Sequence, residues 1–231
     1  MPRRPRNAPG GLVYHALNRA NGRGSLFHKD GDYAAFERIL EEAARRFPGV
    51  GVLGYCLMPN HWHLVLWPQK DGELSAFVRW LTVTHAQRYH AHYHSVGRGH
   101  VYQGRFKSFP VQTDEHLLVL LRYVEAKALK AKLVGKAQAW RWGSLWRRLK
   151  GSKKERAMLA AWPVARPRDW VEMVNRPPPE AQAKRVEESV ERSRPLGDDA
   201  WTARTAARLG LDWTLRPWGR PPKPKGPQRS K

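Results

Sequence analysis

The stretch that decides the fold is Met58-Pro59-Asn60-His61-Trp62-His63-Leu64-Val65-Leu66-Trp67. Two short apolar runs, residues 50–58 and 61–67, are separated only by Pro59 and Asn60, residue types that favour a tight turn. This spacing predicts a β-hairpin. Because strand side chains alternate between faces, His61 and His63 point to one side of the hairpin, and Trp62 and Leu64 point to the other.

His61 and His63 therefore converge on one point of the predicted sheet. Neutral imidazoles spaced in this way suit a divalent metal ion and leave positions open for water or a phosphate oxygen. The alternative is a pair of half-exposed histidines on an edge strand. The spacing taken by itself favours that alternative.

Further periodic segments surround the hairpin and complete an α+β pattern. In chain order, we expect a strand at 12–18, a helix at 30–46, the hairpin, a helix from 74 to 89, a strand at 106–112 and a helix capped by Thr113 or Asp114. This order predicts an α+β sandwich in which an antiparallel sheet is covered by helices on one face.

The composition divides the chain into four parts. Residues 1–11 form a basic N-terminal arm, and residues 12–135 form the α+β domain. Residues 136–200 are a Trp-, Arg- and Pro-rich extension that we expect to wrap the core, and residues 201–231 are a helix followed by a basic tail. We expect the Pro- and Gly-rich tail to be extended and mobile.

Charge indicates the class of partner. The 231 residues include 42 Lys and Arg against 20 Asp and Glu, a formal net charge of +22. A chain tolerates such self-repulsion best when its partner is a polyanion, so nucleic acid is the leading partner. The single cysteine, Cys56, excludes a disulfide framework and a Cys-rich zinc finger. No apolar run approaches the ~18 residues of a membrane span, so we expect a cytoplasmic, nucleoid-associated protein with no membrane partner.

Several motifs, in matching order and spacing, resemble the IS200-like single-tyrosine transposases, in particular the REP-associated tyrosine transposases. They are Tyr14 to Arg19, Met58 to Leu64, His100 to Ser108 and Leu121 to Ala126. Trp140 to Ser144, Leu209 to Leu211 and Arg216 to Pro221 resemble the distal signature of the REP-associated group. The resemblance covers nearly the whole chain.

The resemblance implies a ferredoxin-like HUH endonuclease fold with a basic C-terminal extension. It implies that His61 and His63 bind a divalent metal, Mg²⁺ or Mn²⁺, and that Tyr123 is the nucleophile. Attack by the tyrosine would give a 5′-phosphotyrosine and free a 3′-OH, so that strands can be rejoined without ATP. The implied substrate is single-stranded or hairpin DNA from REP-like repeats. We expect the protein to act as a monomer or a homodimer.

Lys127 departs from the family's pattern. A Gln or Asn one helical turn after the tyrosine often completes the metal site of the family, and a charged ammonium has no lone pair with which to bind the ion. Three alternatives stay open. His15 or another side chain supplies the third ligand, Lys127 supplies positive charge beside Tyr123 and the phosphate, or this chain has weakened or lost cleavage.

Basic side chains near the motifs are candidate DNA contacts. Arg105 and Lys107 flank Phe106, an arrangement that combines phosphate contacts with base stacking. The alternative is a strand whose basic residues are solvated. The complete candidate set is Arg3, Arg4, Arg6, Arg19, Arg105, Lys107, Arg122, Arg216 and Arg220.

The leading function is a metal-dependent single-stranded DNA endonuclease and strand transferase. Its main rival is a catalytically silent DNA-binding protein derived from such a transposase, and a ribosome-associated RNA-binding protein is a third alternative. All three explain the charge. Only the enzyme requires Tyr123, His61 and His63 together.

Overall fold

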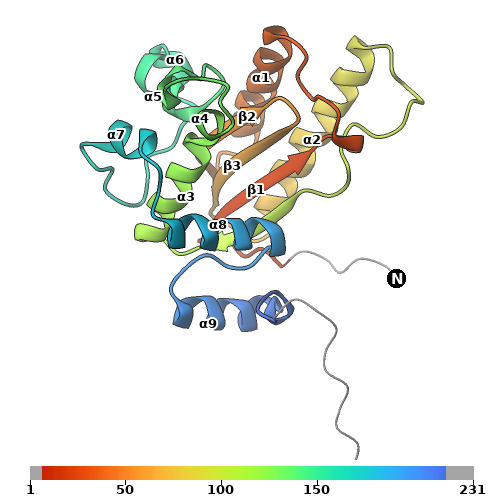
Figure 1. The fold of residues 1–231 in the computed structure, drawn as a ribbon. Coiled ribbons are helices and arrows are strands. Elements are labelled where there is room, and N and C mark those ends of the chain that lie inside the picture. The colour runs from red at the N-terminus through yellow and green to blue at the C-terminus, as the bar shows by residue number, and fades with distance from the viewer. Residues whose placement is uncertain (1–6, 217–231) are drawn as a thin grey trace, which may run out of the picture.

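A four-stranded antiparallel sheet forms the centre of the computed structural model, which describes residues 7–216 (Figure 1). Its strands are β1 (Val13–Arg19), β2 (Val50–Met58), β3 (His61–Pro68) and β4 (Lys107–Val111), in the spatial order β2-β3-β1-β4. The hairpin predicted around Pro59 and Asn60 is the β2–β3 pair, in which Met58 lies opposite His61. Each strand begins and ends within one residue of the range that the sequence predicted.

The sheet's first layer of helices consists of α1 (Asp30–Arg46) and α2 (Glu73–His92), which lie behind the sheet in Figure 1. Their apolar side chains pack on the face that carries Trp62 and Leu64. The α+β class and the ferredoxin-like sheet are therefore confirmed. Within residues 7–216, no helix is long and apolar enough to cross a membrane.

A second layer lies on the opposite face, where the sequence had predicted no helix. There α3 (Glu115–Glu125), followed by the short α4 (Lys127–Lys130), packs Leu117 and Leu121 against Val65 and Phe109. Asp114 caps α3, because its side chain accepts a hydrogen bond of 2.9 Å from the backbone N–H of His116. The apolar stripe of α3 must be buried, and the free face of the sheet is the surface that buries it.

The extension that follows α4 covers both edges of the sheet. It contains η2 (Ala137–Ala139), α5 (Ser144–Lys150), α6 (Lys153–Arg156), α7 (Trp170–Asn175) and α8 (Glu180–Arg192). At the β2 edge, the Leu57 N–H donates to the Trp142 carbonyl at 2.9 Å. At the β4 edge, the Leu196 N–H donates to the Pro110 carbonyl at 2.9 Å. These contacts satisfy backbone groups that an open edge would expose.

A buried carboxylate joins this extension to α3. One oxygen of Glu125 accepts a 2.6 Å hydrogen bond from the Ser144 hydroxyl, and the other accepts a 2.7 Å hydrogen bond from the Trp170 indole N–H. The Ser144 hydroxyl also accepts from the Tyr55 backbone N–H at 3.0 Å. Burial raises the pKa of Glu125 above its usual range. The last turn of α3 is thus fixed to α5, α7 and β2 together.

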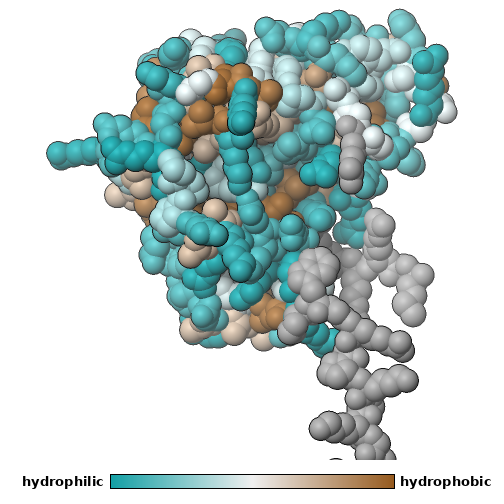
Figure 2. Space-filling view, viewed as in Figure 1, coloured by the Kyte–Doolittle hydropathy of each residue, from teal (hydrophilic) through white to brown (hydrophobic). Residues whose placement is uncertain are grey.

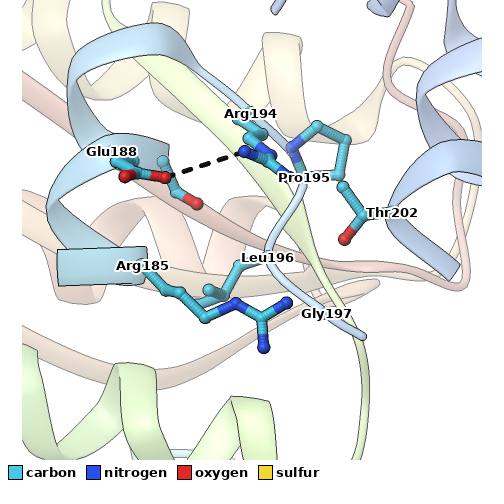
Figure 3. A pocket seen from close by; sticks show the side chains of 8 residues that line it. Arg185, Glu188, Arg194, Pro195, Leu196, Gly197 and Thr202 are labelled. Carbon is cyan, nitrogen blue, oxygen red and sulfur yellow. Dashed lines mark ion pairs between the residues drawn. The ribbon is translucent and has the colours of Figure 1, made fainter. Parts of the chain in front are cut away.

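The remaining elements lie at the periphery. They are η1 (Asn21–Arg23), α9 (Asp199–Leu209) and η3 (Asp212–Thr214), and α9 lies below α8 in Figure 1. Between α8 and α9 is a hollow of about 20 Å³, lined by Arg185, Glu188 and Arg194 among others (Figure 3). Arg194 and Glu188 form an ion pair of 3.6 Å across it. A hollow of this size holds about one water molecule.

Candidate active site

A pair of buried histidines lies at the centre of the site. His63 on β3 and His15 on β1 are almost completely buried, and His15 Nε2 lies 2.9 Å from His63 Nδ1. Their rings are stacked, with centroids 5.0 Å apart. The second nitrogen of His63, Nε2, is buried and has no hydrogen-bond partner among the described residues. A tautomer with the proton on Nδ1 would donate to His15 and leave the Nε2 lone pair for a ligand.

His61 supplies the second imidazole of the predicted pair. Its ring centroid lies 5.0 Å from that of His63, which places both rings on one face of the hairpin as the alternation predicted. His61 Nδ1 lies 2.6 Å from Asn60 Oδ1, and since this oxygen only accepts, Nδ1 carries the proton. The lone pair of His61 is therefore on Nε2. Sequence reasoning missed this role of Asn60, although it directly precedes His61.

The three imidazoles are neutral at neutral pH. Burial, and next the positive charge of Lys127, lowers the pKa of His61 to about 4 and that of His15 to about 3. The same two causes hold the pKa of His63 well below its usual range. Neutral imidazole is the form that binds a metal ion, and the unpartnered Nε2 of His63 fits that role.

Tyr123 lies in the last turn of α3, and its ring packs beside the histidines. Its ring is nearly perpendicular to that of His63, with centroids 6.2 Å apart. Lys127 Nζ donates to the Tyr123 hydroxyl at 2.6 Å and lies 4.0 Å from the ring centroid. Burial lowers the pKa of Lys127 to about 8 and raises that of Tyr123 above its ordinary value. The structure thus brings together five predicted residues: His15, His61, His63, Tyr123 and Lys127.

Helix α8 brings acidic groups to the same place. Glu187 and Glu191 both contribute to the raised pKa of Tyr123. Glu187 pairs with Lys130 at 2.6 Å, and Lys107 Nζ donates to the Glu191 carbonyl at 3.4 Å. Sequence reasoning did not identify these glutamates, because nothing local links α8 to a tyrosine so far away in the chain.

The candidate DNA contacts lie in several places. Arg19 ends β1 opposite His61, and it is exposed. Lys107 begins β4, and Arg105 precedes it beside α2. The Arg122 guanidinium donates to the backbone carbonyls of Arg176 and Pro177, at 2.9 and 3.2 Å.

The termini hold the other candidates. The Arg216 carbonyl accepts a hydrogen bond from Arg192. Arg3, Arg4, Arg6 and Arg220 lie outside the described residues. Hydrophilic side chains cover most of the face in Figure 2.

A different group of possible metal-binding side chains lies at the start of α3. It consists of Asp114, Glu115 and His116. Asp114 is already engaged, since its oxygen caps the helix and lies 2.8 Å from His116 Nδ1. Tyr123 lies near the opposite end of this helix. This group is therefore separate from the histidine pair.

Residues 10–127 match the model of a protein family described as "Transposase IS200 like". The chain belongs to the IS200-like transposase family. The match covers just over half of the chain and includes His15, His61, His63, Tyr123 and Lys127. Recognition of the family from the motifs is confirmed. None of the curated proteins matches the chain.

Two solved structures are similar to this chain. A REP-associated tyrosine transposase bound to a REP hairpin is similar with a TM-score of 0.50 and 17% identity, over 69% of this chain and 88% of that chain. A candidate transposase from Deinococcus radiodurans R1 is similar at 18% identity with a TM-score of 0.39, over 53% of this chain and 94% of that chain. At 17% identity, the similarity to the REP-associated tyrosine transposase supports the fold alone.

Proposed function

We propose that this IS200-like transposase is a metal-dependent single-stranded DNA endonuclease and strand transferase with Tyr123 as its nucleophile. One observation carries the proposal. Tyr123 lies against His63, and the Nε2 atom of that histidine is buried without a partner. A buried polar atom without a partner is costly unless a ligand binds there.

His61 and His63 would hold the divalent metal through their Nε2 atoms. When bound, a Mg²⁺ or Mn²⁺ ion polarises the scissile phosphate and offsets the charge of the transition state. His15 then acts as a positioning residue, because its hydrogen bond to Nδ1 orients the His63 ring. The remaining nitrogen of His15, Nδ1, is also buried without a partner, but in this tautomer it carries the proton, so His15 supplies no third ligand while His63 binds through Nε2.

Lys127 would act on the nucleophile. Its ammonium, 2.6 Å from the Tyr123 oxygen, stabilises the phenolate and so opposes the burial that raises the pKa of Tyr123. Tyr123 loses its proton to water, and its oxygen bonds to phosphorus as the bond from phosphorus to the 3′ oxygen breaks; the released 3′ oxygen takes up a proton from water. The products are a 5′-phosphotyrosine and a 3′-OH strand end. Attack by another 3′-OH on the phosphotyrosine reverses the step and rejoins strands.

The proposed substrate is hairpin DNA with a single-stranded segment. The net charge of +22 suits a polyanion, and the similar structure holds a REP hairpin. Cleavage needs an accessible backbone, which single strands provide. With such a substrate we further propose a cytoplasmic, nucleoid-associated location and a monomeric or homodimeric state.

The test is a denaturing-gel assay for a covalent adduct between protein and DNA. Hairpin oligonucleotides from repeats near the gene are incubated with Mg²⁺, Mn²⁺ or EDTA. We expect a metal-dependent adduct that is lost in Tyr123→Phe and in His63→Ala. The matched control is Tyr89→Phe, which changes a tyrosine on α2. This variant should still form the adduct.

Absence of an adduct with every metal, together with hairpin-selective binding, would refute the enzyme. It would favour the catalytically silent DNA-binding protein. Cleavage would then have been lost because Lys127 occupies the position of a metal ligand. An adduct that persists in EDTA would refute metal dependence alone, and would leave Lys127 as the cation that assists Tyr123.

A further inference from the structure

A groove runs along the outer side of α2. It consists of two adjoining hollows, which we call the α2 groove. The hollow of about 620 Å³ is lined by Asn18, Arg79, Thr82, Val83, Arg105 and Phe106 among others. The hollow of about 500 Å³ is lined by Arg46, Phe47, Arg79, Trp80 and Val83 among others. Arg79 and Val83 line both, so the hollows adjoin, and each has the volume of a ligand pocket.

The charges that line the α2 groove all have one sign. Arg46, Arg79 and Arg105 are exposed, and no Asp or Glu lines either hollow among the described residues. Other hollows of this protein are lined by charges of both signs. Glu41 accompanies Arg45 in a hollow beside α1, and Glu188 pairs with Arg194 in the hollow of Figure 3. Electrostatics therefore favours an anionic occupant for the α2 groove.

The wall of the groove is apolar. Val83 is 47% exposed in the middle of it, and the rings of Trp80 and Phe106 line its two halves. The Arg46 guanidinium lies 5.9 Å from the Trp80 ring centroid. Arginine beside aromatic and aliphatic surface suits a single strand, whose unpaired bases have open faces and whose phosphates are charged. In a duplex these base faces are stacked inside the helix and cannot reach such a wall.

The groove reaches the end of β1, the strand that also carries His15. Asn18 lines it and donates to the Gly104 carbonyl at 3.2 Å. The next residue, Arg19, points to the other face of β1 and lies opposite His61 in the strand pairing. One strand could therefore pass from the histidine pair over the end of β1 into the groove.

We propose that the α2 groove binds the single-stranded DNA that flanks the hairpin, on one side of the scissile phosphate. This inference rests on the proposed function, since it names the part of the substrate that reaches beyond the cleavage site. Arg79 contacts a phosphate, and Val83 packs against a base.

The test measures binding without cleavage. Fluorescence anisotropy gives the Kd, without added metal, of a blunt hairpin and of hairpins with a flank of about ten nucleotides on the 5′ or the 3′ side, a length within the usual site size of single-strand binders. Arg79→Ala removes a groove charge, and Arg156→Ala removes an exposed charge on α6. Val83→Glu places a carboxylate in the groove. Its control, Val96→Glu, places a carboxylate at a valine that is 80% exposed and lines neither hollow.

We expect Arg79→Ala and Val83→Glu to weaken binding of one flanked hairpin about five- to tenfold, and to leave the blunt hairpin within twofold of wild type. Loss of one phosphate contact should also reduce the salt slope for that hairpin by about 0.7. The two control variants should show no difference between flanked and blunt hairpins.

Two results would overturn the inference. One is an equal loss for blunt and flanked hairpins, which would assign the groove to the duplex stem. The other is no loss beyond that of the controls. If the wild type does not prefer any hairpin to a random duplex, the proposed function itself fails, and with it this inference.

Discussion

Replacing Lys127 by glutamine should make the protein more stable at neutral pH. The lysine has a pKa of about 8 in the folded chain instead of its ordinary 10.5, so keeping its ammonium half-buried costs about 3 kcal/mol at pH 7. Glutamine removes that cost. It also removes the 2.6 Å hydrogen bond to the Tyr123 hydroxyl, which contributes about 1 kcal/mol. We therefore expect Lys127→Gln to be more stable than wild type by about 2 kcal/mol at pH 7.

The pH dependence follows from the same shift. Because the folded chain binds this proton more weakly than the unfolded chain, the stability of the wild type rises with pH between about 8 and 10.5. The glutamine variant lacks this contribution. The free-energy difference between the two proteins should therefore shrink by about 2 kcal/mol from pH 7 to pH 10. Titratable groups that both proteins share contribute equally to the two free energies of unfolding and cancel in the difference.

The assay is urea unfolding followed by tryptophan fluorescence at several pH values. Lys130→Gln is the matched control, because this lysine is exposed and pairs with Glu187 at the surface. We expect that control to stay within about 0.5 kcal/mol of wild type at every pH. A difference for Lys127→Gln that is constant from pH 7 to pH 10, or a variant less stable than wild type at pH 7, would refute the reasoning.

Three further predictions test individual contacts. Asp114→Ala should lower the free energy of unfolding by about 1 kcal/mol, since it removes the cap of α3; an unchanged urea midpoint would contradict this. His15→Phe should weaken Mn²⁺ binding about 10- to 100-fold in calorimetry, because His63 loses the group that orients it; equal affinity would assign His15 no role at the metal. Glu125→Gln should destabilise the fold by about 1–3 kcal/mol, since one of two donors would face an amide N–H; wild-type stability at pH 7 would show that the carboxyl group is dispensable.

Local features of the sequence were sufficient to predict the sheet and the histidine pair. The alternation around Trp62 assigns His61 and His63 to one face, and Pro59 with Asn60 marks the turn between the strands. Both signals act over a few residues and do not depend on the rest of the chain. This explains why the strand bounds agree with the prediction to within one residue.

Contacts between segments that are far apart in the sequence could not be predicted from these local features. His15 entered as a candidate ligand, but only the pairing of β1 with β3 reveals that it contacts His63 Nδ1. Spacing of four residues placed Tyr123 and Lys127 on one face, and the structure adds that both are half-buried. Family resemblance, and no feature of composition, distinguished Tyr123 from the other tyrosines. The second layer of helices was missed because a helix pattern does not specify which face of a sheet it covers.

The buried Glu125 has a consequence for the order of events during synthesis. The two side chains that donate to it, Ser144 and Trp170, leave the ribosome after the histidines and Tyr123 have already done so. Domains fold as they emerge, yet a chain that ends before Trp170 leaves this carboxylate incompletely paired next to the helical turn of Tyr123. We expect the site around Tyr123 to become rigid only once the extension has been translated, so that a nascent or prematurely terminated chain would carry every residue of the proposed active site without their folded arrangement.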